Sequence, residues 1–289
     1  MRYEGMVYRP PSEARSFILQ VTIGCAHNDC TFCTMYKEKQ FRIRKMDEIR
    51  ADIEEVFSVY GDNIRRIFLA DGDALVIPTP QLKEILGLLR ARFPSAERIT
   101  SYGAPHDILR KTPEELRELN EAGLEMVYMG LESGDDEVLR RVKKGATAAQ
   151  IIEAGKKLKA AGIQASVTLI SGLGGRERLR EHAIASAQAI SEMKPEYVGF
   201  LTLMVEEPAP IVDEIASGRM ELLTPEEVVD EMELFLSNVD SEGTVFRANH
   251  ASNYMLLKGN LNEDIPAMIA QIQDIRQRHG FRAERWRAL

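Results

Sequence analysis

Three cysteines, Cys25, Cys30 and Cys33, are the only ones in this 289-residue sequence, and they lie within nine consecutive residues. Cysteines that merely fill a core behave as small apolar residues and are scattered with it. Thiolates crowded on one loop instead favour a soft metal: an iron–sulfur cluster, zinc or copper(I). Three protein ligands also leave one coordination position open, which in metal sites usually indicates chemistry rather than a structural role.

Zinc is the main alternative at this loop. His27 lies between the first two cysteines and would complete a Cys3His ligand set. A zinc finger normally has a second pair of Cys or His ligands at a typical spacing, and no such pair follows here. The spacing is therefore unusual for zinc. A zinc-stabilised barrel that acts as a binding or scaffold protein remains the alternative from a different class.

Composition and charge indicate which compartment and which classes of partner to expect for this protein. The net charge of −8 and the pI near 5.4 give no overall basic footprint for nucleic acid. The sequence has no signal-peptide core and no run of about eighteen apolar residues. An odd number of cysteines without an export signal is typical of a reducing compartment. We expect a cytoplasmic protein with neither a membrane nor a nucleic-acid partner.

Strands alternate with amphipathic helices along the chain. Thr112 and Thr224 each begin a Thr-Pro-Glu-Glu sequence, which is typical of a capped helix start. The expected strands are 16–23, 64–70, 98–102, 124–130, 163–170 and 197–203, and the expected helices are 45–60, 80–92, 112–123, 147–161, 176–193, 224–239 and 266–279.

Six strand–helix units predict a parallel sheet with right-handed crossovers, and they fall short of the eight units of a closed barrel. We therefore expect an α/β fold, an open (β/α)6 partial TIM barrel with outer helices. It would comprise an N-terminal arm (1–14), the partial barrel (15–240) and a C-terminal extension (241–289) that closes it. Ligands collect at the carboxyl ends of strands in such sheets. The cysteine loop and three further polar or Gly-rich loops all follow strands, so we expect them on one rim.

The cysteine loop, directly after the first strand, resembles the radical S-adenosylmethionine (radical SAM) superfamily. The usual signature of that family has three residues between the first two cysteines and two between the second pair, with an aromatic before the last. Phe32 is that aromatic, and the second spacing matches. The first spacing has four residues, 26–29, which is one more than usual. The resemblance covers roughly residues 15–240.

This resemblance implies a [4Fe–4S] cluster with Cys25, Cys30 and Cys33 as ligands, and SAM chelated to the fourth iron. One electron, from a donor such as flavodoxin or ferredoxin, would cleave SAM to methionine and a 5′-deoxyadenosyl radical. That radical would abstract hydrogen from a small-molecule or protein substrate. A barrel interior would shield the radical from water.

The resemblance also implies SAM contacts in three loops. The stretch Asp71–Asp73 resembles the family's Gly-Gly-Glu motif, with Asp in place of the first Gly and of the Glu. Residues 130–141 resemble the branch that contains coproporphyrinogen dehydrogenases and methylthiotransferases. The implied contacts are Gly72 and Asp73 for the methionine ammonium, Glu132 and Ser133 for the ribose, Arg140 or Arg141 for the carboxylate, and Ile170, Gly172 and Leu173 for adenine. The alternatives are a plain Asp-Gly turn, a helix cap with surface charges, and a Gly-rich loop without a ligand.

A polar stretch at 246–254 follows the sixth helix, where a seventh strand would return to the barrel. His250 is a candidate catalytic residue for proton transfer near neutral pH. The substrate-facing candidates are Asn249, Ser252, Asn253 and Tyr254. The alternative is a polar cap over the open barrel end.

The count of three cysteines narrows the expected chemistry. Sulfur insertion from a second cluster would need further cysteines, as would auxiliary-cluster extensions. We therefore expect a minimal, single-cluster enzyme with an unidentified substrate. A further alternative retains the cluster but cleaves SAM at another carbon and transfers an aminocarboxypropyl group.

Overall fold

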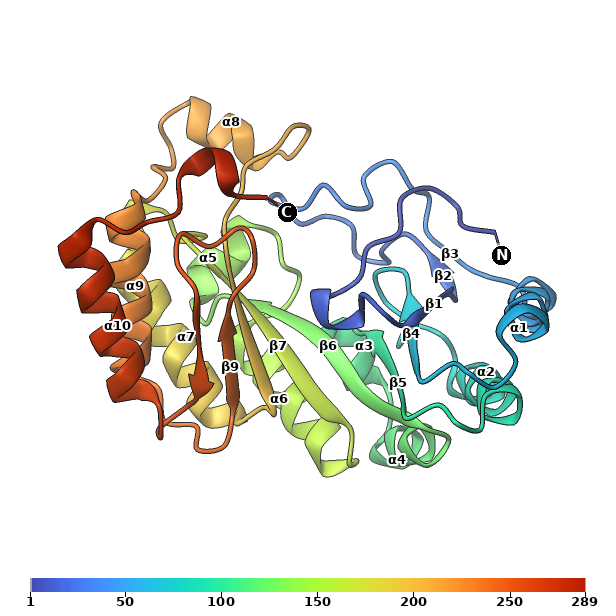
Figure 1. Ribbon diagram of the computed structural model, residues 1–289. Coiled ribbons are helices and arrows are strands. Elements are labelled where there is room, and N and C mark those ends of the chain that lie inside the picture. The colour runs from blue at the N-terminus through green and yellow to red at the C-terminus, as the bar shows by residue number, and fades with distance from the viewer. Residues whose placement is uncertain (1, 289) are drawn as a thin grey trace. The chain divides into compact units, whose positions relative to one another are not determined.

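A mostly parallel sheet of eight strands forms the centre of the computed structural model, which describes residues 2–288 (Figure 1). The sheet order is β1-β4-β5-β6-β7-β8-β9-β10. The strands are β1 Phe17–Gln20, β4 Arg66–Ala70, β5 Arg98–Tyr102, β6 Leu124–Glu132, β7 Gln164–Ser171, β8 Tyr197–Thr202, β9 Val245–Ala248 and β10 Leu257–Asn260. The pairs β1–β4, β4–β5, β5–β6, β7–β8 and β8–β9 are parallel, whereas β10 pairs antiparallel with β9. This confirms the predicted α/β partial barrel.

The chain divides into two compact units. Unit 1 contains residues 2–28, 35–129 and 157–165, and unit 2 contains 29–34, 130–156 and 166–288. Strand β6 thus begins in unit 1 and ends in unit 2. The division into arm, barrel and C-terminal extension stays a prediction, although β9 pairs parallel with β8 as the expected seventh strand would.

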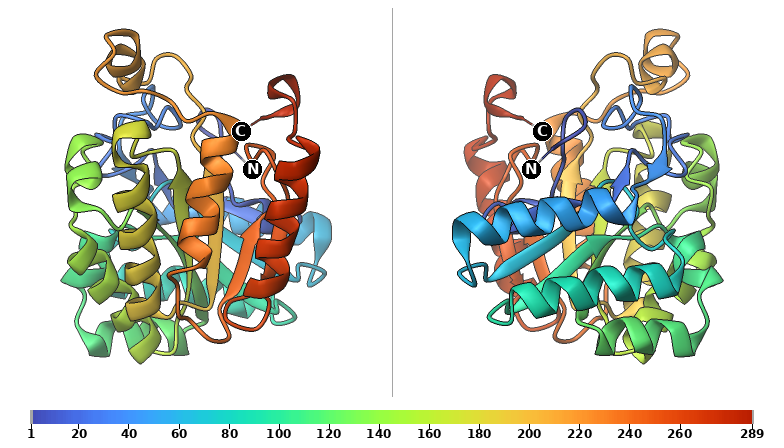
Figure 2. Two further views of the ribbon diagram at one scale, coloured as in Figure 1. Left: turned by 90° about the vertical axis from the view of Figure 1, so that its left-hand side faces the viewer. Right: turned by 90° about the vertical axis from the view of Figure 1, so that its right-hand side faces the viewer.

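Unit 1 packs its helices around an aromatic core. The rings of Phe17 and Phe57 both meet Phe93 edge-on, at centroid distances of 5.8 and 6.0 Å. Helices α1 and α2 lie side by side (Figure 2). The helices are α1 Met46–Tyr60, α2 Thr79–Arg92, α3 Pro105–Arg110 and α4 Pro113–Glu121, and a small antiparallel sheet joins β2 Thr22–Ile23 to β3 Arg42–Ile43.

Unit 2 has its own aromatic cluster, in which Phe200 contacts Phe235 and Phe246 at 4.7 and 5.4 Å between ring centroids. Helices α9 and α10 lie side by side there (Figure 2). The helices are α5 Asp136–Arg141, α7 Leu179–Met193, α8 Ile211–Ala216, α9 Pro225–Leu236 and α10 Ile265–Arg278; α6 Ala148–Ala160 begins in unit 2 and ends in unit 1. Short 3-10 turns cover Pro11–Glu13, Arg176–Arg178 and Glu284–Trp286.

Local sequence signals fix several helix ends. Thr112 accepts a hydrogen bond from the Glu115 backbone, and the Glu115 side chain accepts one from the Thr112 backbone. Thr224 and Glu227 repeat this capping box at the start of α9. Both boxes satisfy backbone N–H groups that lack intrahelical partners. Within residues 2–288, no helix is long and apolar enough to cross a membrane.

Candidate functional site

The cysteine loop leaves β2 at Gly24 and returns through β3. None of the three cysteines forms a disulfide, and all three are partly exposed. Cys25 lies in unit 1, whereas Cys30 and Cys33 lie in the segment 29–34 of unit 2. Backbone hydrogen bonds from Thr31 to the Val142 carbonyl (3.0 Å) and from Ile211 to the Thr31 carbonyl (3.0 Å) hold that segment in unit 2. The three thiols are not used in disulfides, as a role as metal ligands requires.

Gly72 brings the loop after β4 directly against Cys25. Its N–H donates to the Gly24 carbonyl at 3.1 Å. A Cβ atom placed on Gly72 would lie 2.9 Å from Cys25 Cβ and 2.9 Å from a ring carbon of Tyr36. No side chain fits there, so only glycine allows this approach. The structure therefore brings together two of the predicted residues, Gly72 and Cys25.

Asp73 is fully buried and faces a second carboxyl group that the sequence analysis missed. Its Oδ1 accepts from the Leu75 backbone at 3.0 Å. Burial, and then the neighbouring Asp107, raise the pKa of Asp73 well above its usual range. His106 Nε2 lies 2.6 Å from an Asp107 oxygen, and ligand atoms of Asp73, His106 and Asp107 all lie within 4.8 Å of one another. A usable signal was the pair of titratable residues His106 and Asp107 shortly after β5.

In unit 2, the loop after β6 is tightly held. Glu132 adopts a left-handed backbone conformation (φ 63°), and its carboxylate accepts from Lys144 Nζ at 2.9 Å. Ser133 is buried, with its hydroxyl 2.8 Å from His182 Nδ1. Gly134 N–H donates to Ser186 Oγ at 2.9 Å, which ties this loop to α7. The side chains predicted to bind ribose are therefore preorganised, and their ribose role stays a prediction.

The two candidate arginines differ in position. Arg140 is exposed and pairs with Glu137 of its own helix. Arg141 is mostly buried, pairs with Glu177 at 2.5 Å and donates to the Leu173 carbonyl at 3.1 Å. The structure thus brings Arg141 to the Gly-rich loop after β7, whereas Arg140 contacts its own helix.

The Gly-rich loop is fixed from behind by a buried glutamate of α9. Gly172 is left-handed (φ 81°), and its N–H donates to Glu231 Oε1 at 2.9 Å. Leu173 is fully buried in an apolar cluster, and Ile170 packs against the same cluster. The adenine role of these three residues stays a prediction. Sequence reasoning missed Glu231 because it lies within an ordinary amphipathic helix.

The stretch 249–254 is anchored by its own polar groups. Ser252 Oγ accepts from the Thr202 backbone at 3.2 Å, and Asn253 donates to the Phe200 carbonyl at 2.8 Å. Tyr254 hydrogen-bonds Glu284 at 2.8 Å. His250 Nδ1 lies 2.9 Å from Ser252 Oγ, and burial, helped by Arg282, lowers the pKa of His250. Asn249 is exposed. The catalytic and substrate-facing roles of this stretch stay predictions.

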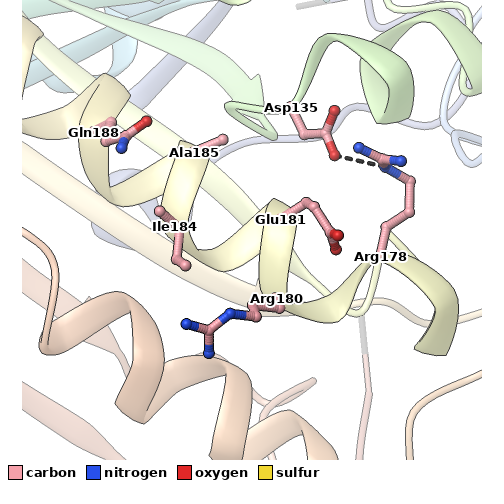
Figure 3. A pocket seen from close by; sticks show the side chains of 7 residues that line it. All are labelled: Asp135, Arg178, Arg180, Glu181, Ile184, Ala185 and Gln188. Carbon is pink, nitrogen blue, oxygen red and sulfur yellow. Dashed lines mark hydrogen bonds and ion pairs between the residues drawn. The ribbon is translucent and has the colours of Figure 1, made fainter.

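A pocket of about 390 Å³ lies over α7 and holds none of the predicted site residues (Figure 3). Two of the residues that line it, Asp135 and Arg178, lie next to each other and form a 2.7 Å ion pair (Figure 3). The remaining lining residues are Arg180, Glu181, Ile184, Ala185 and Gln188. Because Asp135 and Arg178 already pair with each other, neither of these two charges is available to a ligand in this pocket.

The chain matches a family model described as the radical SAM superfamily over residues 19–185. This match contains the cysteine loop and the loops after β4, β6 and β7, and it exceeds half of the 289 residues. The heme chaperone HemW of Bacillus subtilis (strain 168) is 20% identical over 183 residues, which are 63% of this chain and 48% of that protein. A tRNA-2-methylthio-N(6)-dimethylallyladenosine synthase of Dehalococcoides mccartyi (strain CBDB1) is 29% identical over 163 residues, 53% of this chain and 36% of that protein. The chain therefore spans about half or less of the length of these relatives.

Solved structures show the same fold. Methylornithine synthase (PylB) superposes with a TM-score of 0.53 at 16% identity, covering 90% of this chain and 81% of that one. Coproporphyrinogen III oxidase (HemN) from Escherichia coli gives a TM-score of 0.55 at 17% identity, covering 77% and 52%. Because the family model matches more than half of the sequence, the chain belongs to the radical SAM superfamily of enzymes, whose cofactors are a [4Fe–4S] cluster and S-adenosylmethionine.

Proposed function

We propose that this enzyme holds its [4Fe–4S] cluster with Cys25, Cys30 and Cys33 and uses the radical derived from SAM to take hydrogen from a substrate. The observation that carries this proposal is the set of three partly exposed cysteines, none of them in a disulfide, in the part of the chain that the family model matches. Three thiolates for four irons leave one iron for SAM. When bound, these cofactors supply a one-electron cleavage of the sulfonium to methionine and the 5′-deoxyadenosyl radical.

Residues of unit 1 would receive the methionine end of SAM. The Gly72 backbone can lie directly against Cys25 because glycine has no Cβ atom. This close approach supports a backbone contact to the methionine ammonium, next to the first cluster ligand. The Asp73 carboxyl would add an acceptor, and its raised pKa makes that contribution depend on pH.

Residues of unit 2 would orient the nucleoside and the carboxylate. Glu132 and Ser133 would bind the ribose, and Ile170, Gly172 and Leu173 would lie along adenine. Arg141 supports the carboxylate role better than Arg140, because it is mostly buried and already contacts the Leu173 carbonyl.

His250 would accept or donate a proton near the substrate. Its lowered pKa keeps the imidazole neutral at neutral pH, which is the form that accepts a proton. A flavodoxin or ferredoxin would supply the electron. The substrate would be a small molecule or a protein, since the acidic chain has no overall basic footprint for nucleic acid. The names of the relatives, a heme chaperone and a tRNA-modifying synthase, point to no common substrate.

Anaerobic reconstitution with iron and sulfide tests this proposal. We expect about four irons per chain, a general property of such clusters, and release of 5′-deoxyadenosine once the protein is reduced with SAM present. Stoichiometric zinc without SAM cleavage would instead support a scaffold protein. An aminocarboxypropyl product would assign cleavage to another carbon of SAM.

The variant Cys30→Ala tests the ligand assignment. It should abolish SAM cleavage and lower the iron content, while circular dichroism shows an unchanged fold. Thr34→Ala, in the same loop segment but without a thiol, is the matched control and should retain both cluster and cleavage. Unchanged turnover in Cys30→Ala would reject the assignment.

A further inference from the structure

Asp71 occupies the position at which the resembled motif has its first glycine, and its side chain is fully buried. Its Oδ2 accepts from the Gly24 backbone at 2.9 Å and from Lys39 Nζ at 2.8 Å. Gln20 Nε2 lies 3.1 Å from each carboxylate oxygen. One carboxylate thus gathers three donors from segments that are 32 to 51 residues away in sequence. An aspartate that only formed an Asp-Gly turn would not require these long-range contacts.

Two of the donors mark the two arms of the cysteine loop. Gly24 immediately precedes Cys25, and Lys39 lies on the return toward β3. The arms touch, because a Cβ on Gly24 would lie 3.2 Å from Lys39 Cβ. Further along, Asn28 is left-handed (φ 40°), donates to the Tyr36 carbonyl at 2.9 Å, and its own carbonyl accepts from Lys37 Nζ at 2.7 Å. All of these contacts lie within unit 1.

We propose that Asp71 and Lys39 are a positioning pair that closes the unusually long cysteine loop and sets the charge beside the cluster. The inference rests on the proposed function, because it assumes a cluster at Cys25. The Lys39 side chain is 9% exposed and that of Asp71 is not exposed at all. Removing one partner of such a pair leaves the other buried and uncompensated, whereas removing both does not.

Opposite single substitutions therefore have opposite electrostatic effects. Asp71→Asn leaves a positive charge next to the residue before Cys25. Reduction makes the cluster more negative, so this variant should shift the reduction potential to more positive values. Lys39→Met leaves a negative charge and should shift the potential the other way. The double variant should return close to the native value.

Arg44 and Asp52 provide a matched control. They form a 2.7 Å ion pair in the same unit, with side chains that are 3% and 4% exposed. Asp52→Asn breaks an equally buried pair without touching Asp71, Lys39 or Gly24. It should lower the melting temperature as much as Asp71→Asn does, yet leave the iron content and the potential unchanged.

The experiment measures iron per chain, the EPR spectrum and the reduction potential of reconstituted native protein and the four variants. The inference predicts several-fold less iron in Asp71→Asn and potential shifts of opposite sign in the two single variants. Native iron content and potential in both would overturn it. If Asp71→Asn does not fold, Lys39→Met and the double variant decide by the same shifts. A native protein that binds no iron would reject the proposed function instead.

Discussion

Asp71 in unit 1 and Glu231 in unit 2 are buried carboxylates, and each hydrogen-bonds a loop that is predicted to bind the cofactors. Each accepts the backbone N–H of a left-handed glycine, Gly24 or Gly172, at 2.9 Å. They differ in their cations. Asp71 pairs with Lys39 at 2.8 Å, whereas Glu231 lies 3.8 Å from the ring nitrogen of His182. Among the described residues, Glu231 Oε2 has no hydrogen-bond partner, and burial raises the pKa of Glu231.

A buried carboxylate can therefore hold a glycine-containing loop either with a paired lysine, as Asp71 does, or without one, as Glu231 does. The arrangement in unit 1 depends on a charge pair. In unit 2, Glu231 also accepts from the Ser171 hydroxyl at 2.6 Å, and His182 reaches on to Ser133. The unit 2 network therefore links the loops after β6 and β7 through a buried carboxyl group and a histidine, and the raised pKa of Glu231 should make it sensitive to pH.

The largest loss of stability is expected at Gly134, where the loop after β6 contacts the backbone of α7. A Cβ on Gly134 would lie 2.2 Å from the Ala185 carbonyl oxygen in α7. Backbone cannot move aside as a side chain can, so Gly134→Ala should lower the free energy of unfolding by about 3 kcal/mol. Chemical denaturation measures this. Gly87→Ala, with nothing within 4 Å in the interior of α2, is the control and should be stabilising by about 0.5–1 kcal/mol.

The corresponding glycine of unit 1 should be less costly to replace. A Cβ on Gly72 would lie 2.9 Å from Cys25 Cβ and from a Tyr36 ring carbon and 3.2 Å from Cys25 Cα, a milder overlap than the one at Gly134. Gly72→Ala should cost about 1–2 kcal/mol and displace Cys25, so that iron incorporation falls more than stability does. Iron analysis beside a melting curve separates the two effects. Full iron loading in Gly72→Ala would contradict the close approach.

The pH dependence of stability should reveal the buried carboxyl group of Glu231. The pKa of Glu231 is raised above the usual 4.5, so the folded protein holds its proton more tightly than the unfolded chain. This contribution is fully present below about pH 4.5 and is lost as the pH rises through the folded pKa. Glu231→Gln, which mimics the protonated acid, should remove that loss, as urea denaturation at a series of pH values would show.

Glu227 on the same helix supplies a control of opposite sign. The Thr224 cap and Arg176 lower the pKa of Glu227, so its contribution is present above the usual 4.5 and is lost as the pH falls. Glu227→Gln should therefore flatten the acid side of the curve. If Glu231→Gln and Glu227→Gln changed stability on the same side of the pH curve, the assignment of Glu231 as a buried acid would be wrong.

The smallest effect concerns the two arginines of α5. Arg141→Ala removes the hydrogen bond to the Leu173 carbonyl and should weaken SAM binding to the reconstituted protein about tenfold, the equivalent of about 1.4 kcal/mol. Arg140→Ala breaks only an exposed pair within the helix and should leave the affinity unchanged. Calorimetric titration with SAM measures both. Equal effects would remove the distinction between the two side chains.

Much of the fold was predictable because its signals are local. The strand at 98–102 was predicted with the observed bounds, and the capping box at Thr112 was read from four consecutive residues. Helices α3, α5 and α8 were missed because each has six residues, fewer than two turns, and shows no helical periodicity.

The candidate site was predictable only as a set of loops. The role of Asp71 depends on Gln20, Gly24 and Lys39, which are distant in sequence, so no local pattern indicates it. Ser252 and Asn253 show the same limit. Their polar groups meet the backbone of β8, and sequence does not tell whether such a group faces a ligand or a neighbouring strand.

The central claim, a cluster on three cysteines with one iron open to SAM, is tested most directly by EPR of the reduced, reconstituted protein with and without SAM. SAM that binds an iron changes the environment of that iron, so the account predicts a reduced [4Fe–4S] signal that shifts when SAM is added. Absence of the signal, or a signal that SAM leaves unchanged, would contradict it.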